Sequence, residues 1–142
     1  MDAGFKDACE LILALALGAA VGFERRLRGH PAGIHTHALV ALGSCAFVIA
    51  GLGLPGNNLA VVPTSVVTGS GFICAGVILH RGVNVQGLNT AATLWCVSAL
   101  GVLCAVNRPS LACIVASAAL LTNLILHYVE HTLLKTSPDK AN

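Results

Sequence analysis

The sequence predicts an all-α integral membrane protein: a bundle of five transmembrane helices with the N-terminus outside and the C-terminus in the cytoplasm. Of its 142 residues, 56% are hydrophobic and 10% are Asp, Glu, Lys or Arg, whereas a soluble domain usually carries about a quarter charged residues. No such charged residue occurs from Gly29 to His80, a run long enough to cross a bilayer twice at about 20 residues per span. We therefore expect no soluble domain large enough to house an enzyme.

Five apolar segments are the predicted spans. They cover Ala8 to Phe23, Gly33 to Leu54, Leu59 to Leu79, Leu88 to Val106 and Pro109 to Val129. The first is the weakest, because the apolar run between Glu10 and Glu24 is short enough for a core or interfacial helix, and Glu10 must lie at the interface if this segment spans. The spans make up one transmembrane domain over residues 1–134, and residues 135–142 are a short polar tail.

The connections between the predicted spans contain residues that favour turns. Residues 55–58 read Pro-Gly-Asn-Asn, which suits a reversal between the second and third spans. Asn107 precedes the fifth span, and Pro109 occupies a position that the first turn of a helix tolerates. Both pairs of spans therefore form helical hairpins.

The distribution of basic residues predicts the orientation, because cytoplasmic loops retain Lys and Arg. With five spans, six basic residues fall on one side: Arg25, Arg26, Arg28, Arg81, Lys135 and Lys140. Only Lys6 and Arg108 fall on the other. The richer side is the cytoplasmic one, which places the N-terminus outside.

The sequence shows no pattern typical of a metal site, a catalytic site or a nucleic-acid-binding surface. The cysteines form no CxxC pair and no Cys/His spacing typical of zinc, so they are expected to be small apolar packing residues. His35 and His37 are two apart and point to different faces of a helix. No catalytic arrangement of Ser, His and Asp or of paired carboxylates is apparent. We expect no metal, no cofactor and no enzymatic activity, and the net charge of +2 is too small to indicate nucleic-acid binding.

Small residues recur along the third span, at Gly69, Gly71 and Gly76 among others. In lipid, helices associate by close approach over small faces, since there is little hydrophobic driving force between them. We expect this face to pack against another helix of the same chain, with a self-association face as the alternative. The alternative makes a homodimer the working prediction for the oligomeric state.

Charged residues gather just after the first span. Glu24 and Arg25 begin a cluster that either only sets the topology or also holds an ion pair at the membrane edge, from Glu24 to a nearby arginine or to Arg81. The arginines also attract anionic lipid headgroups. Membrane lipid is therefore one expected partner.

A polar segment precedes the fourth span. Asn89 or Thr90 is expected to cap the helix by accepting hydrogen bonds from its first backbone amides. Capping does not account for Asn84, Gln86 and Gly87. We expect this loop to face a partner or a solute.

Four stretches resemble the MgtC/SapB family of bacterial inner-membrane proteins, in consistent order and spacing. They are Gly22 to Arg26 (GFERR), Pro31 to Gly43 (PAGIHTHALVALG), Gly69 to Ile78 (GSGFICAGVI) and Gly87 to Cys96 (GLNTAATLWC). The resemblance implies five spans and a cytoplasmic C-terminus, in agreement with the charge distribution. By motif match it carries over eleven positions for partner contacts or packing: Glu24, Arg25, Gly33, Thr36, Gly69, Gly71, Gly76, Gly87, Asn89, Thr90 and Thr93.

The resemblance also implies a function. Members of the family are linked to growth in low magnesium and to survival of pathogens inside host cells, through a regulatory role associated with restraining the F-type ATP synthase. We therefore expect a regulatory protein of the bacterial inner membrane; the alternative is a channel or transporter for Mg²⁺ or another small solute. Mid-depth carboxylates typical of cation-coupled transporters are lacking.

The chain departs from the family pattern in two ways. Full-length members carry a soluble C-terminal domain, whereas this sequence stops at Asn142 and is expected to be either a short member or a truncated one. His35 and Gln86 stand where the family often has Arg, and Arg81 falls in a loop where an acidic residue may precede the glycine. Family contacts that depend on those charges do not carry over.

Overall fold

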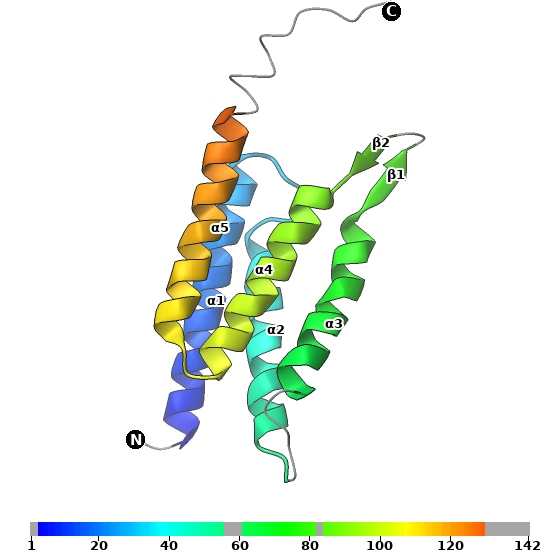
Figure 1. Cartoon of the computed structure of the whole chain (residues 1–142). Helices are drawn as coiled ribbons and strands as arrows, with labels where there is room; N and C mark the ends of the chain where they lie inside the picture. Colours follow the sequence, from blue (N-terminus) through cyan, green and yellow to red (C-terminus); the bar gives the residue numbers. More distant parts are fainter. Residues whose placement is uncertain (1–2, 56–60, 82–83, 130–142) are drawn as a thin grey trace, which may run out of the picture.

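The computed structural model describes residues 3–55, 61–81 and 84–129, and it contains the five helices that the sequence predicts (Figure 1). They are α1 (Ala3–Leu27), α2 (Ile34–Leu52), α3 (Val61–Val77), α4 (Leu88–Ala105) and α5 (Pro109–Val129). A short antiparallel pair of strands, β1 (Leu79–Arg81) and β2 (Asn84–Gln86), stands between α3 and α4. The predicted polar tail over 135–142 and most of the predicted turn at 55–58 lie outside the described residues.

Successive helices run in opposite directions, so their ends gather at two ends of the bundle (Figure 1). The C-terminal ends of α1, α3 and α5 lie at the same end as the N-terminal ends of α2 and α4, and the β1–β2 pair projects from it. We call this the hairpin end. Arg25 and Arg28 lie there, which agrees with the predicted gathering of basic residues on one side.

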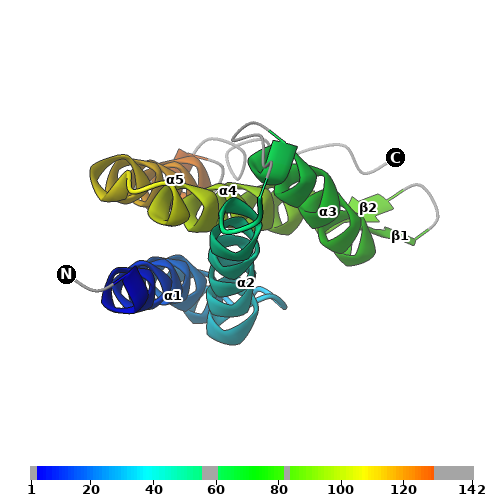
Figure 2. The same ribbon diagram turned by 90° about the horizontal axis from the view of Figure 1, so that it is seen from below.

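Helix α4 is the centre of the bundle. It contacts each of the other four helices, and the view along the bundle shows α1 and α2 on one side of it with α3 and α5 flanking it (Figure 2). Its residues Leu94, Val97 and Leu100 are almost completely buried. They join Val21 of α1 and Val48 of α2 in the hydrophobic core, where close packing of apolar side chains provides most of the contact energy in lipid.

Glycines allow α2 to lie directly against two neighbours. A Cβ added at Gly18 of α1 would lie 2.7 Å from the Ala41 Cβ of α2. A Cβ added at Gly101 of α4 would collide with the Ala41 carbonyl oxygen and would lie 2.7 Å from the Ser44 Cβ. These contacts bring backbones together as small residues do in membrane bundles, and Ser44 and Ser98 then share a hydrogen bond of 3.0 Å between α2 and α4.

The cap of α4 differs from the prediction. Gly87 is the N-cap, with φ of 91°, and no side chain makes a capping hydrogen bond, so the expectation that Asn89 or Thr90 caps this helix is wrong. The left-handed backbone at Gly87 suits glycine, and a Cβ there would collide with the Val77 carbonyl oxygen. The helix therefore begins at Leu88, before either of the expected cap residues, and the Thr90 hydroxyl is available to bond to another helix.

The first and third helices have other bounds than predicted. Helix α1 extends beyond the apolar segment at both ends, because its charges pair along the helix: Lys6 Nζ lies 3.6 Å from Glu10 Oε1, and Arg28 pairs with Glu24. Such i, i+4 pairs support a helix. Helix α3 ends at Val77, and Leu79 already belongs to β1.

Three helical segments are long and apolar enough to cross a membrane: Ile34–Leu52, Leu88–Ala105 and Pro109–Leu126. Helix α3 is also apolar but shorter, and α1 carries more charge. The described chain is thus a helical bundle with three candidate membrane-spanning segments.

Candidate functional site: a buried polar cluster at the hairpin end

The Arg25 side chain is the most deeply buried charge in the described part of the chain. Its side chain is 1% exposed, and its Nη2 donates a hydrogen bond of 3.0 Å to Oγ1 of Thr90, which is 3% exposed. The two residues come from α1 and α4 and are far apart in the sequence. Within the described residues no carboxylate lies at ion-pair distance from Arg25, and its Nε is buried without a hydrogen-bond acceptor. A buried, incompletely bonded cation is costly, so a role beyond stability is a reasonable expectation.

A second set of polar contacts joins α1 to α5 beside Arg25. Glu24 pairs with Arg28, as the sequence predicts for a nearby arginine. Asn123 of α5 contacts both residues: its side-chain Nδ2 donates to Glu24 Oε2 over 3.4 Å, and its backbone carbonyl oxygen accepts from Arg28 Nη1 over 3.3 Å. Glu24 is therefore engaged within the bundle. The side chain of Arg81, the other predicted partner, lies outside the described side chains.

The first turn of α2 packs beside the contacts of α1 with α4 and α5. His37 is fully buried, and its Nδ1 lies 2.9 Å from the Gly33 carbonyl oxygen, while its Nε2 has no hydrogen-bond partner among the described residues. Gly22 of α1 fits against this turn, since a Cβ at Gly22 would lie 2.7 Å from the Gly33 oxygen and 2.9 Å from the His37 Cβ. His35 is exposed, so the two histidines do face different ways.

Helix α3 is tied to the same end of α4. Cys74 Sγ donates to the Ala91 carbonyl oxygen over 3.2 Å. Within α4, Thr93 Oγ1 donates to the Asn89 carbonyl oxygen over 2.8 Å, so the Thr93 hydroxyl is satisfied locally. All four family-like stretches thus contain a residue that packs at this end of the bundle.

The structure brings together only some of the predicted positions. Glu24, Arg25, Gly33, Gly87, Thr90 and Thr93 lie in or beside the polar cluster formed by Arg25, Thr90, Glu24, Arg28, Asn123 and His37. Asn89 is exposed at the start of α4. Thr36 lies on a different surface, which lines a groove between α2 and α3.

The glycines of α3 do not pack as expected. No heavy atom of the described chain would lie within 4 Å of a Cβ placed at Gly69, Gly71 or Gly76. The expectation that they pack against another helix of the same chain is therefore wrong. Helix α3 instead packs through a narrow stripe that includes Ser70, its buried residue, because the other helices lie on that side only.

The cluster offers hydrogen-bond donors and acceptors and charge. In residues 3–55, 61–81 and 84–129 there is no group of three or more His, Cys, Asp or Glu side chains able to hold a metal ion. Three members, Arg28, Asn123 and His37, were not among the eleven predicted positions, although Arg28 belongs to the predicted group of arginines after the first span. His37 falls inside a family-like stretch, whereas Asn123 lies in an apolar helix with no local signal beyond its own polarity.

A family model described as the MgtC family matches residues 11–132. This chain belongs to the MgtC family. Protein MgtC of Salmonella typhimurium strain LT2 is 40% identical over 122 residues, which cover 86% of this chain and 53% of that protein. Protein MgtC of Brucella abortus strain 2308 is 42% identical over 114 residues, covering 80% of this chain and 48% of that protein.

The MgtC-family match contains the whole polar cluster, from Glu24 to Asn123. The chain spans about half the length of the curated relatives that it matches. No solved structure matches it. The resemblance identified from the four stretches is confirmed at the level of the family.

Proposed function

We propose that this MgtC-family chain is a regulatory module of the bacterial inner membrane that binds another membrane complex, the F-type ATP synthase, and restrains it. In this proposal the chain links growth in low magnesium to energy supply and has no enzymatic activity of its own. The observation that carries it is the open face of α3, formed by Gly71, Phe72 and Gly76. The two glycines meet no atom of the described chain, and Phe72 is 85% exposed.

The open face of α3 suits contact with another transmembrane helix. Glycines let backbones approach closely in lipid, and the neighbouring phenylalanine offers a large apolar side chain to a partner. The polar cluster supports this role from inside, because it holds α1, α4 and α5 together at one end. The same face is the proposed surface for a homodimer, so a second copy and the ATP synthase compete for it.

All five helices span the membrane in this proposal, with the hairpin end in the cytoplasm. Arg25 and Arg28 support that orientation, because positively charged ends remain on the cytoplasmic side. Reporter fusions after Arg28 and after Asn107 are expected to report cytoplasmic and periplasmic locations, respectively. The opposite pattern, or the same location for both, would contradict the proposed topology.

Site-specific crosslinking in native membranes tests the partner. A photoreactive residue at Phe72 is expected to capture membrane subunits of the F-type ATP synthase or a second copy of the chain. The matched control is Ile12 of α1, which is also exposed, at 66%, but carries no open glycines beside it.

A substitution within the open face of α3 gives a second test of the proposed partner. Gly71→Leu is expected to reduce capture several-fold without loss of folded protein, because a side chain there meets open space in the chain but separates the helices of a complex. Equal capture from Phe72 and Ile12, or capture that contains no ATP synthase subunit, would refute the proposed partner. Unchanged ATP levels on expression would refute the proposed restraint.

A further inference from the structure

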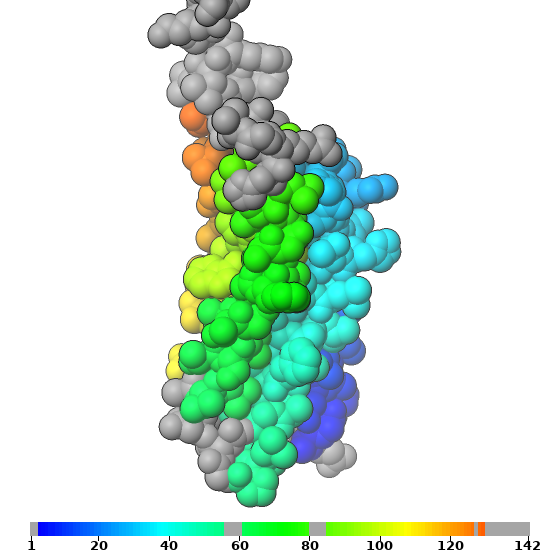
Figure 3. Space-filling model, turned by 90° about the vertical axis from the view of Figure 1, so that its right-hand side faces the viewer, coloured from blue at the N-terminus to red at the C-terminus, as the bar shows by residue number. Residues whose placement is uncertain are grey.

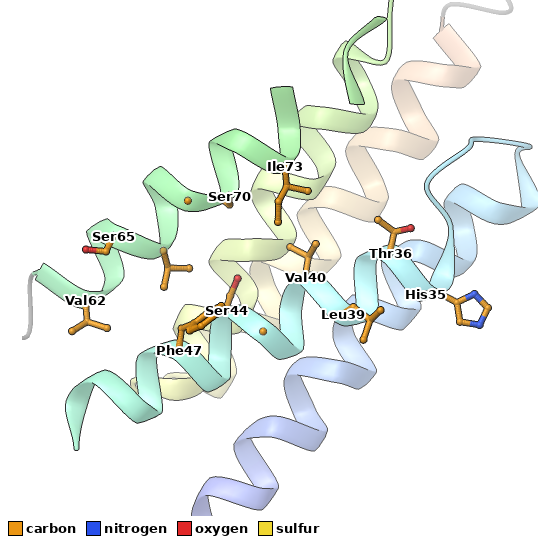
Figure 4. A pocket seen from close by; sticks show the side chains of 13 residues that line it. His35, Thr36, Leu39, Val40, Ser44, Phe47, Val62, Ser65, Ser70 and Ile73 are labelled. Carbon is orange, nitrogen blue, oxygen red and sulfur yellow. The ribbon is translucent and has the colours of Figure 1, made fainter. Parts of the chain in front are cut away.

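A groove separates α2 from α3 on the side of the bundle away from α1. Its volume is about 810 Å³, and residues of both helices line it (Figure 4). The lining begins at His35, in the first turn of α2, and ends at Phe47 of α2 and Val62 of α3. Figure 3 shows α3 and α2 as neighbouring columns on this face. Cavities of this size with mostly apolar walls are typical of ligand sites.

The groove narrows toward the end remote from the hairpin. There α2 and α3 touch, because a Cβ at Gly51 would lie 2.6 Å from a Val62 methyl group. Toward the hairpin end α3 leans away from α2 and over α4 (Figures 1 and 2). The groove is therefore a wedge that opens near the first turn of α2.

The walls of the groove present an apolar surface even where the residues are polar. Ser44 Oγ bonds to Ser98 Oγ at 3.0 Å. Ser65 Oγ donates to the Val61 carbonyl oxygen, and Ser70 Oγ donates to that of Val67. These hydroxyls are already satisfied, so an apolar occupant costs them nothing, whereas an ion or polar solute gains little from them.

The groove is long enough for acyl chains. The distance along α2 from His35 to Phe47 is about 18 Å at 1.5 Å per residue. An extended acyl chain of a phospholipid can follow this length along the apolar walls of the groove.

Arg26 of α1 lies beside the residue that precedes α2, close to the open end of the wedge. The aliphatic part of the Arg26 side chain lies against Gly33, where its Cβ and Cδ would be 3.5 Å from an added Cβ. Gly33 is the residue before α2, and His35 and Thr36 line the groove one turn further on. Basic residues at a membrane surface attract anionic headgroups.

We propose that this groove is a binding site for an anionic phospholipid, with acyl chains between α2 and α3 and the phosphate beside Arg26 and His35. The bound lipid fills the wedge and fixes the angle of α3, the helix whose open face the proposed function uses. The site does not depend on that function, since it is defined by α2, α3 and Arg26 alone.

Lipid retention after purification in detergent tests the site. The full chain is incubated with phosphatidylglycerol or with phosphatidylcholine, and the lipid that remains bound is counted by native mass spectrometry. Gly43 and Gly69 line the groove, and a Cβ added at either position meets nothing within 4 Å. Gly43→Leu and Gly69→Leu therefore place an apolar side chain in the groove, and they are expected to fold and to lose most of the retained lipid. Gly71→Leu and Gly76→Leu are the matched controls, because these positions are equally open but do not line the groove.

Headgroup selectivity tests the charged end. Arg26→Gln is expected to lower the preference for phosphatidylglycerol over phosphatidylcholine about fivefold, the effect of one interfacial charge. Arg108→Gln, at the other end of the bundle, is expected to leave it unchanged. Equal lipid retention by Gly43→Leu and the unsubstituted chain, or no preference between the two lipids, would overturn the proposal. Loss of dimer mass in Gly43→Leu with retained lipid would assign the groove to a second copy and also overturn it.

Discussion

Replacement of Gly101 by alanine is expected to cost about 3 kcal/mol of unfolding free energy, at the upper end of the usual cost of overpacking. The added methyl group would collide with the Ala41 carbonyl oxygen and would lie 2.9 Å from the Cys45 backbone nitrogen. Both atoms belong to the backbone of α2, so no rotation of a side chain relieves the contact. The two helices must move apart, and the hydrogen bond between Ser44 and Ser98 is lost with them.

Reversible unfolding in mixed detergent, followed by circular dichroism, measures this cost. Gly43→Ala is the control, since a Cβ at Gly43 meets no atom within 4 Å, and alanine in a helix is expected to gain up to about 1 kcal/mol over glycine. If Gly101→Ala were as stable as Gly43→Ala, α2 and α4 would not be in the direct contact described above.

The hydrogen bond between Arg25 and Thr90 is expected to dominate the stability of the polar cluster. Thr90→Val keeps the shape of the side chain but leaves a buried guanidinium donor without its acceptor, at an expected cost of about 2 kcal/mol. Arg25→Met removes the charge itself and is expected to change stability by less than about 1 kcal/mol, because an apolar side chain of similar length needs no partner.

The two substitutions together give the decisive comparison. In the Arg25→Met background, Thr90→Val is expected to cost less than about 0.5 kcal/mol, so the double-mutant cycle yields a coupling energy of about 1.5 kcal/mol or more. Ser117→Ala is the control, because this exposed hydroxyl bonds only within its own helix. Additive costs would mean that Arg25 and Thr90 do not interact. If the cluster is the site of regulation, Arg25→Met folds normally yet loses its effect on ATP levels.

The sequence predicts helices best where apolar runs end at turn-forming residues. The bounds of the fifth predicted segment, Pro109 to Val129, are confirmed as those of helix α5, and the second and fourth predicted segments differ from α2 and α4 by at most two residues at either end. Helix α1 runs further at both ends than its apolar core, because pairs of charges one turn apart keep Ala3 to Leu27 helical. A hydropathy pattern alone does not detect such pairs of charged residues.

The sequence does not indicate which residues of different helices contact each other. Arg25 and Thr90 both occur in family-like stretches, but no local pattern relates one to the other. The sequence predicts that Asn89 or Thr90 caps the helix, whereas the N-cap is Gly87, which has a left-handed backbone. The glycines of α3 show the same limit, since spacing indicates a small face but not whether another helix of the chain lies against it.

The central position of α4 has a consequence for biogenesis. A nascent chain that has released α1, α2 and α3 from the ribosome still lacks the helix that contacts each of them. Until Leu88 to Ala105 is made, Arg25 has no threonine to bond, and the surfaces of α1, α2 and α3 that pack against α4 lack that partner. The bundle therefore stays incomplete for most of synthesis, and we expect a chain interrupted before Leu88 to be degraded faster than the chain that contains α4.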